Sequence, residues 1–189
     1  MDNAIQQYFK QTFNISDKDW DFLASKIYKC EYKKKTTLLK IGKIENYVYF
    51  IEKGVIRYFI PKEETDITIG FNFQNEFGSS YDSFLTKTPS SYQIETLTDS
   101  ILWKLTYEDL QEIYHKTDIG NIIGRIMIEE LFKNKSKRLI SLLNTTAEER
   151  YIDLLSEQPH IIQLIPLKYI ASYIGVTPQA LSRIRKRIY

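Results

Sequence analysis

The sequence predicts an α+β protein with an antiparallel β-roll in its N-terminal part, then a long helix, then a helix-turn-helix domain. Three observations predict this order. Short segments rich in Val, Ile, Thr, Tyr and Phe fill residues 36–105, a long amphipathic segment follows, and residues 166–189 hold two short apolar periodicities separated by a glycine. We therefore expect a β-rich domain over 1–117, a connecting helix over 118–143 and a helical domain over 144–189.

The composition is that of a folded protein with a proper core. Of the 189 residues, 43% are hydrophobic and 14% are aromatic, which argues against disorder. No apolar run approaches membrane-spanning length, and Met1–Lys10 is mixed and polar, so we expect a cytoplasmic protein with no membrane partner. The single cysteine, Cys30, has no partner for an internal disulfide and is interpreted as a structural thiol.

Positive charge is concentrated at the C-terminal end of the chain. The net charge is only +2, from 26 basic and 24 acidic residues. Residues 144–189 hold six basic and four acidic residues, so the rest of the chain balances at 20 of each. The six basic residues are Arg150, Lys168, Arg183, Arg185, Lys186 and Arg187.

Two helices are expected before the roll, over residues 2–11 and Asp17–Lys29, with Ser16 as N-cap of the second. The expected strands are Thr36–Ile41, Tyr47–Glu52, Val55–Ile60, Asp66–Phe73, Tyr92–Leu97 and Ile101–Leu105. With no helices between them, such strands favour an antiparallel roll, barrel or sandwich. The connection Gln74–Ser91 is long for a hairpin, and long loops in compact domains are often functional.

A short helix over Tyr107–Tyr114 and a long one over Asp118–Leu143 should follow the roll. The long helix has an apolar stripe that a basic stretch, Lys133–Arg138, interrupts. We interpret the stripe as a dimerisation seam, the alternative being packing on the protein's own sheet. Its members are Ile119, Ile122, Ile123, Ile126, Met127, Leu131, Phe132, Leu139, Leu142 and Leu143.

The last two dozen residues have the pattern of a helix-turn-helix. After a helix over Ala147–Ser156, capped by Thr146 and ended by Pro159, a second helix begins beyond Pro166. Its inward face is formed by Leu167, Ile170, Ala171 and Ile174. Gly175 supplies the left-handed turn, Thr177 caps the final helix, and Leu181, Ile184 and Ile188 face the core.

The opposite face of the final helix carries Gln179, Ser182, Arg183 and Lys186, and four of the last seven residues are basic. Polar and basic side chains on a helix held at this angle are typical of binding in the major groove of DNA. The alternative is an ordinary helical hairpin with a basic, solvated end. We favour DNA binding, because the charge is gathered where a duplex would lie.

The order of these parts resembles the Crp/Fnr family of bacterial transcription regulators, and within it a branch common in Bacteroidetes-type bacteria. The resemblance covers about Tyr32 to Arg187. It is carried by Thr36–Gly42 (TLLKIG), Tyr49–Phe59 (YFIEKGVIRYF), the long helix, Ala147–Tyr151 (AEERY) and Ile170–Lys186 (IASYIGVTPQALSRIRK). It implies a cyclic-nucleotide-binding-like sensor roll, a double-stranded β-helix, and a homodimer on near-palindromic double-stranded DNA. It also implies RNA polymerase as a further partner.

The effector positions of the family are altered here. Cyclic-nucleotide-binding members use a Gly-Glu pair for the ribose and an Arg-Ser pair for the phosphate. The matching positions are Ser79-Ser80 and Ser90-Ser91, so the acid and the arginine are both missing. An anion buried without a counter-charge would carry an uncompensated desolvation cost. These serines remain a candidate effector pocket, and we expect a ligand other than cyclic AMP, or none.

The resemblance places the base-reading positions on Pro178, Gln179 and Arg183. Gln179 can pair with adenine, Arg183 with guanine, and Ser182 with a base or a phosphate. Family members often carry a β-hairpin wing beyond this helix, and the sequence ends at Tyr189. We therefore expect phosphate attraction from the remaining basic residues. The full predicted set is Thr177, Gln179, Ser182, Arg183, Arg185, Lys186 and Arg187.

Other chemistries find little support in the sequence. The two histidines, His115 and His160, lie outside the expected roll, so no metal, haem or other cofactor is expected. We find no nucleophile–base pair and no Gly-rich phosphate loop, so an enzyme is the least favoured hypothesis. The alternative to a DNA-binding regulator is a small-molecule-binding roll whose basic helical tail docks a protein partner.

Overall fold

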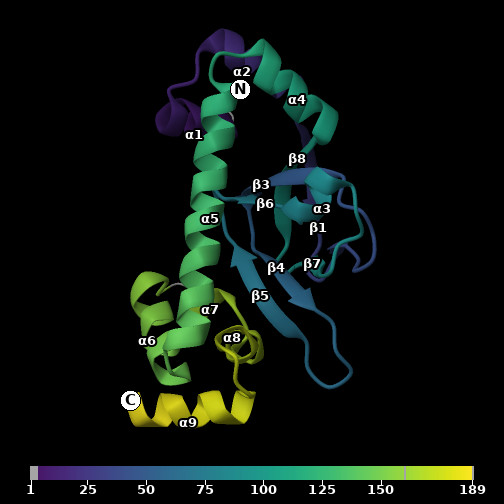
Figure 1. Cartoon of the computed structure of the whole chain (residues 1–189). Helices are drawn as coiled ribbons and strands as arrows, with labels where there is room; N and C mark the ends of the chain where they lie inside the picture. Colours follow the sequence, from purple (N-terminus) through teal and green to yellow (C-terminus); the bar gives the residue numbers. More distant parts are fainter. Residues whose placement is uncertain (1–3, 160, 189) are drawn as a thin grey trace.

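The computed structural model describes residues 4–159 and 161–188. A β-roll lies beside one long helix, with further helices at both ends of the molecule (Figure 1). This arrangement confirms the expected α+β fold with its roll, long helix and C-terminal helices. His160 and the first residues of the expected 2–11 helix, Asp2 and Asn3, lie outside the described residues.

The roll consists of two four-stranded sheets in which all strand pairs are antiparallel. The first sheet has the order β1 (Tyr28–Tyr32), β8 (Ser100–Thr106), β3 (Tyr47–Lys53) and β6 (Phe77–Gly78). The second has the order β2 (Thr37–Leu39), β7 (Gln93–Thr96), β4 (Ile56–Ile60) and β5 (Ile67–Asn72). Their facing sides bury Ile51, Ile56, Ile94 and Leu102 completely, which holds the two sheets together.

The N-terminal helices α1 (Ala4–Phe13) and α2 (Asp17–Ala24) form a second apolar core with one side of the roll. Ser16 caps α2, as predicted, accepting the Asp19 N–H at 3.1 Å. The predicted extension of this helix to Lys29 is wrong. The chain leaves the helix after Ala24, and Tyr28–Tyr32 pairs residue by residue with β8, because ladder hydrogen bonds override local helical periodicity there.

The long connection predicted over Gln74–Ser91 is not a plain loop. It contains the short strand β6 and the helix α3 (Tyr81–Thr86), whose Phe84 is completely buried. The hydroxyl of Ser83 accepts the Glu45 N–H at 3.0 Å, and donates to the Thr88 carbonyl at 2.5 Å. The segment is thus built into the roll.

After α4 (Tyr107–Lys116), helix α5 (Gly120–Asn144) runs for 25 residues, about 38 Å, along the molecule (Figure 1). Its first turns are buried at Gly120, Ile123 and Gly124. A Cβ at Gly124 would lie 2.7 Å from the Tyr114 hydroxyl, so glycine permits the close approach of α4 to α5.

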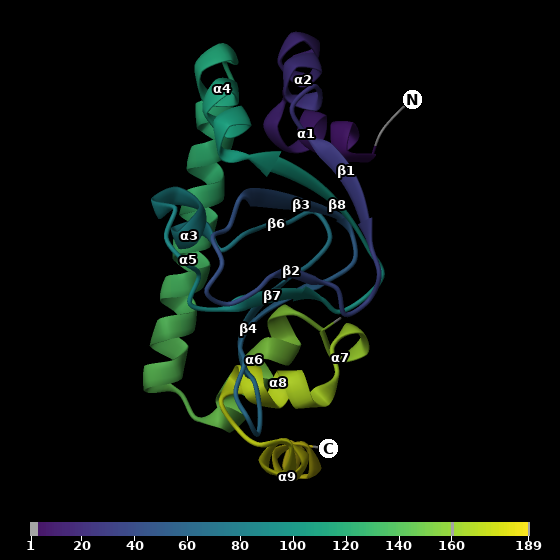
Figure 2. The ribbon, with the colours of Figure 1, turned by 90° about the vertical axis from the view of Figure 1, so that its right-hand side faces the viewer.

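Four C-terminal helices pack under the second sheet (Figure 2): α6 (Ala147–Glu157), α7 (Ile161–Leu164), α8 (Leu167–Ile174) and α9 (Pro178–Ile188). Helix α7 is an additional single turn that the sequence pattern did not predict. Thr146 and Glu149 form a capping box at the start of α6. The core of these helices also includes Val55, Phe73 and Leu97 of the roll, so this core extends into the roll.

Two glycines with positive φ test the packing of the roll. Gly54 (φ +108°) lies between β3 and β4, and an added Cβ would lie 2.7 Å from the Ser100 Cβ. Gly42 (φ +80°) has nothing within 4 Å of the same position. We expect Gly54→Ala to lower the free energy of unfolding by about 2–4 kcal/mol and Gly42→Ala by about 1 kcal/mol. Urea unfolding of both variants measures the difference, and equal losses would contradict it.

Candidate nucleic-acid interface

Helix α8 ends in the turn that the sequence predicts. Ile170, Ala171 and Ile174 are buried, and Gly175 takes the left-handed conformation at φ +82°. The next residue, Val176, donates its N–H to the Ala171 carbonyl at 2.9 Å. The turn therefore closes over a small residue at the helix contact, and it sets the direction in which α9 leaves.

Helix α9 begins as predicted at Pro178, with Thr177 as its cap. The Thr177 hydroxyl accepts the Ala180 N–H at 3.2 Å. Leu181 and Ile184 are buried against the other C-terminal helices. One face of α9 is therefore fixed to the domain, and the opposite face lies at the end of the molecule (Figure 1).

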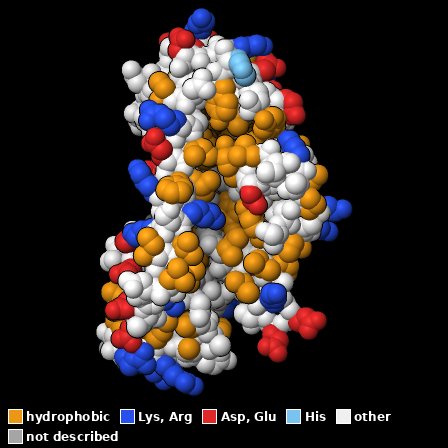
Figure 3. Space-filling model, in the orientation of Figure 1, with side chains coloured by type: hydrophobic (Ala, Val, Ile, Leu, Met, Phe, Trp, Pro, Cys, Tyr) orange, Lys and Arg blue, Asp and Glu red, His pale blue; other side chains and the backbone are white. Residues whose placement is uncertain are grey.

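The structure brings four of the predicted residues onto that outer face. Gln179, Ser182, Arg183 and Lys186 are all exposed, and their i, i+3, i+4, i+7 spacing forms one stripe. Lys and Arg side chains gather at this end of the molecule in the space-filling view (Figure 3). An amide, a hydroxyl and two cations thus point the same way from one rigid helix.

The other three predicted residues have contacts within the protein. The Thr177 hydroxyl is used in the cap. Arg187 forms an ion pair with Glu148 of α6 at 2.5 Å. Arg185 is half-buried beside the stripe, and its Nε has no hydrogen-bond partner among the described residues.

Two arginines that the sequence analysis assigned no specific role hold the C-terminal end of α8. Arg138 of α5 donates to the Tyr173 carbonyl and stacks on the Tyr173 ring at 3.9 Å, and burial lowers its pKa. Arg150 of α6 donates to the Ile174 carbonyl at 2.9 Å and to the Thr145 carbonyl. Cations at the C-terminal end of a helix donate hydrogen bonds to its last carbonyl groups and interact favourably with the negative end of its dipole. They anchor the turn that positions α9.

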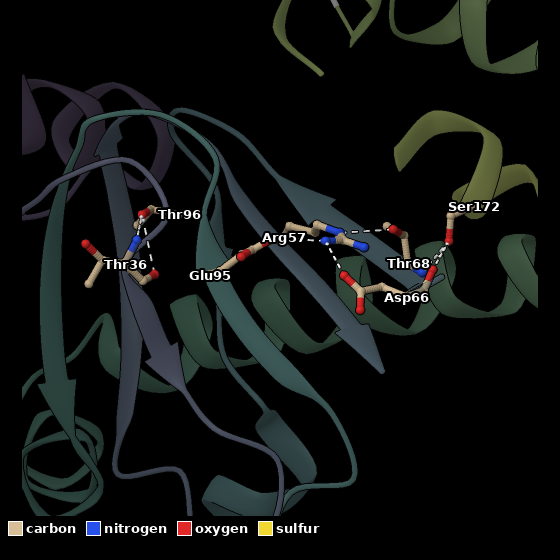
Figure 4. A network of polar contacts seen from close by, with 7 residues as sticks. All are labelled: Thr36, Arg57, Asp66, Thr68, Glu95, Thr96 and Ser172. Atoms are coloured by element: carbon tan, nitrogen blue, oxygen red, sulfur yellow. Dashed lines mark hydrogen bonds and ion pairs between the residues drawn. The ribbon is translucent and has the colours of Figure 1, made fainter. Parts of the chain in front are cut away.

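A third arginine, Arg57 of β4, joins the roll to the C-terminal helices (Figure 4). Its side chain is 1% exposed. It donates to Glu95 at 2.9 Å, Thr68 at 3.0 Å and Asp66 at 3.2 Å. Its guanidinium is stacked 4.2 Å from the Phe59 ring and 3.8 Å from the ring of Tyr169 in α8. The roll supplies the acids and α8 supplies an aromatic face.

Ser172 of α8 makes a second connection to the same hairpin. Its hydroxyl donates to the Asp66 carbonyl at 2.6 Å and accepts the Thr68 N–H at 2.8 Å (Figure 4). Tyr173, next along α8, packs against Phe71 with ring centroids 5.5 Å apart. The first helix of the helix-turn-helix is thus docked on the β4–β5 hairpin.

The candidate effector serines are used internally. Ser80 and Ser90 are buried, and their hydroxyl oxygens lie 2.8 Å apart. The Ser90 hydroxyl also donates to the Tyr92 carbonyl, and the Ser79 hydroxyl donates to the Tyr47 carbonyl, both at 2.8 Å. Ser91 is exposed and separate from this pair. The structure therefore brings two of the four serines, Ser80 and Ser90, into contact.

The predicted seam on α5 divides into two parts. Ile119, Ile123, Ile126 and Met127 pack against the protein's own core, as the alternative interpretation expected. The helix also exposes apolar side chains, and hydrophobic patches interrupted by charged groups lie on this side of the molecule in Figure 3. The exposed members of the predicted seam are Ile122, Leu131, Phe132, Leu139, Leu142 and Leu143. Helix α5 also exposes Ile128 and Ile140, which the prediction did not include.

Two negative findings concern the described residues only. No helix among residues 4–159 and 161–188 combines the length and the apolar character needed to cross a membrane. Within the same residues, no three His, Cys, Asp or Glu side chains gather where a metal ion would be held.

Comparison with known proteins identifies the fold. Residues 29–117 match the family "Cyclic nucleotide-binding domain". No curated protein sequence shows a significant match. The chain is similar to a CooA variant from Carboxydothermus hydrogenoformans, with 14% identity, a TM-score of 0.73, and coverage of 94% of this chain and 82% of that one.

Two further structures share this architecture. FixK2 from Bradyrhizobium japonicum has 14% identity and a TM-score of 0.72, with coverage of 86% of this chain and 84% of that one. A transcriptional regulator of the Crp/Fnr family from Eubacterium rectale has 15% identity and a TM-score of 0.70, with coverage of 96% of this chain and 87% of that one. Identity this low establishes a common fold, and function has to be argued from this chain's own residues.

Removal of the Ser172 hydroxyl should loosen the docking of α8. We expect Ser172→Ala to cost about 1–2 kcal/mol, because it leaves the Thr68 N–H and the Asp66 carbonyl without their partner. Hydrogen exchange measured by NMR should show faster exchange of the Thr68 amide. Ser156→Ala, at an exposed serine of α6, is the control. Unchanged protection at Thr68 would contradict the connection.

Proposed function

We propose that this chain, whose roll matches the cyclic nucleotide-binding domain family and whose fold is that of the Crp/Fnr transcription regulators, is a homodimeric, sequence-specific DNA-binding regulator acting in the cytoplasm. Helix α9 enters the major groove. Helix α5 joins two copies. The roll is a sensor or scaffold, and it does not use the cyclic AMP chemistry of the family.

The observation that carries the proposal is the outer face of α9. It presents Gln179, Ser182, Arg183 and Lys186 from a helix whose inner face is buried and whose start is capped. A helix of this width fits the major groove, where glutamine pairs with adenine and arginine with guanine. Lys186, one turn further along the stripe, supplies charge for a backbone phosphate.

Dimerisation is supported by the spacing of exposed side chains on α5. Ile128, Phe132, Lys135, Leu139 and Leu142 follow one another at intervals of four, three, four and three residues. This is a heptad pattern with one lysine in it, and a single polar residue in such a seam fixes register. Phe132 is 72% exposed in the single chain. A paired helix would cover these side chains and place two copies of α9 about 34 Å apart.

The roll lacks the means to hold a cyclic nucleotide phosphate. The serines at the effector positions are not basic, and Ser80 and Ser90 are already bonded to each other. A buried phosphate would find no arginine among them to compensate its lost hydration.

Selection of bound duplexes from a random DNA pool, with purified protein and no ligand, tests the proposal. Recovery of a two-fold symmetric motif is the expected outcome. If folded, dimeric protein recovers no motif with or without added cell metabolites, the proposal fails, and a protein partner for the basic helix becomes the better hypothesis.

Arg183 and Lys186 should affect DNA binding differently. Arg183→Ala should weaken binding to the selected site by about 1–3 kcal/mol and relax the preference at one base pair. Lys186→Ala should weaken binding to all sequences alike, and should reduce the salt dependence by about one counterion. Fluorescence anisotropy at several salt concentrations on specific and scrambled duplexes measures both. Arg125→Ala, far from α9, is the control, and equal losses on both duplexes for both variants would contradict these roles.

A charge in the α5 seam should separate the protomers. Phe132→Asp would place a carboxylate in an apolar contact, and we expect the dimer dissociation constant to rise by at least about 30-fold, since truncated anchors typically cost 2 kcal/mol or more. Sedimentation equilibrium measures it. The exposed neighbour Asn134→Asp introduces the same charge outside the seam and should leave the dimer intact. A monomeric wild-type protein would contradict the proposal directly.

A further inference from the structure

An apolar cavity of about 50 Å³ lies where the N-terminal helices, the outer side of the first sheet and the start of α5 meet. Its lining residues all fall between Ile5 and Met127 and come mainly from α1, β3, β8, α4 and α5. Helices α1, α2 and α4 lie at the end of the molecule opposite α9 (Figure 1). The lining side chains that the structure describes carry no charge, so the cavity is surrounded almost entirely by carbon.

The cavity lies outside the roll, on the far side of the sheet from the roll interior. Side chains alternate along β3, so Val48 and Phe50 line the cavity, whereas Tyr49 and Ile51 belong to the core between the two sheets. The four candidate effector serines are not among the described lining residues. The cavity is therefore separate from the effector positions.

Rigid groups form the walls of this cavity. The rings of Phe9, Phe50 and Phe77 contact one another, with centroids 5.1–6.0 Å apart. Helix α5 is already in close contact with α4, because a Cβ at Gly120 would lie 2.5 Å from the Ile113 carbonyl oxygen. Packed rings and touching helices cannot close the space by small shifts, so the cavity is a fixed feature of this packing.

We propose that this cavity binds a small, uncharged, apolar molecule that is smaller than benzene. An apolar cavity of about 150 Å³ takes up benzene or xenon, and this one is about a third of that size. Such a ligand gains dispersion contacts with the lining side chains on every side. An ion or a polar molecule would lose its hydration without finding partners. The indole N–H of Trp103, a lining residue, already donates to Glu52 at 2.5 Å.

Half-buried side chains give the ligand a path from the solvent. Phe77, Tyr81, Tyr114 and Met127 line the cavity and are partly exposed. Met127 is unbranched and flexible, so it can move aside at little cost. This inference does not rest on the proposed DNA binding, and its test contains no DNA.

Xenon tests the proposal, because it is small, apolar and uncharged. Methyl-resolved NMR of the whole protein, titrated with dissolved xenon, should show saturable shifts at the lining residues Val48, Ile113 and Ile123, with half-saturation below about 10 mM. Ile51 and Ile94, between the two sheets, should not shift. Propane should shift the same methyl groups as xenon. Ethanol has as many heavy atoms as propane, and it should bind at least about tenfold more weakly, because its hydroxyl would lie without a partner.

A variant that fills the cavity gives the second readout. Val48→Ile adds one carbon to the lining and should weaken xenon binding by more than about fivefold. Val176→Ile makes the same change in the C-terminal helices, outside the cavity lining, and should leave binding unchanged.

The proposal is overturned if xenon gives no saturable shift up to about 10 mM, if the shifts centre on Ile51 and Ile94, or if ethanol binds as well as propane. Equal xenon binding by folded Val48→Ile would overturn it as well. The wild-type titrations decide the matter should Val48→Ile fail to fold.

Discussion

The buried cation Arg57 has partners in both halves of the molecule. Glu95, Asp66 and Thr68 accept hydrogen bonds from its Nε and Nη1 within the roll, and Tyr169 of α8 covers the face of the guanidinium. The penalty for burying a charge is offset only while this set is complete. The roll and the C-terminal helices therefore stabilise each other through one side chain, and the position of α8 depends on β4 of the roll.

The other arginines extend the same principle to the far end of α8. Arg138 comes from α5 and Arg150 from α6, and both donate to the last carbonyls of α8. Helix α8 is thus held at one end by helices and along its side by the β4–β5 hairpin, through Ser172. Since α9 follows α8 directly through the Gly175 turn, fixing α8 also fixes the orientation of the outer face of α9. A helix held in this way would lose little conformational freedom on binding.

Local sequence patterns predicted helices and turns well where a residue type strongly favours one structural role, such as a left-handed turn or a helix cap. Gly175, Thr177, Pro178 and the apolar spacing of the last two helices gave the turn, the cap and the buried face. Pairing partners distant in sequence were beyond such patterns. The first two residues of β1, Tyr28 and Lys29, were predicted as the end of a helix, because their pairing partners in β8 lie more than seventy residues later. In the same way, nothing local in VIRYF shows that Arg57 will meet Tyr169.

The docking of α8 also has a consequence for how the protein is made. Ser172 bonds to residues more than a hundred positions earlier, and Arg57 meets Tyr169 over a similar separation. During synthesis the β4–β5 hairpin emerges from the ribosome first, whereas α8 can reach its position on it only after about a hundred further residues have appeared. Until then the aromatic side of the Arg57 site and the underside of the second sheet remain uncovered. The nascent chain is thus most exposed to misassociation just before α8 is complete.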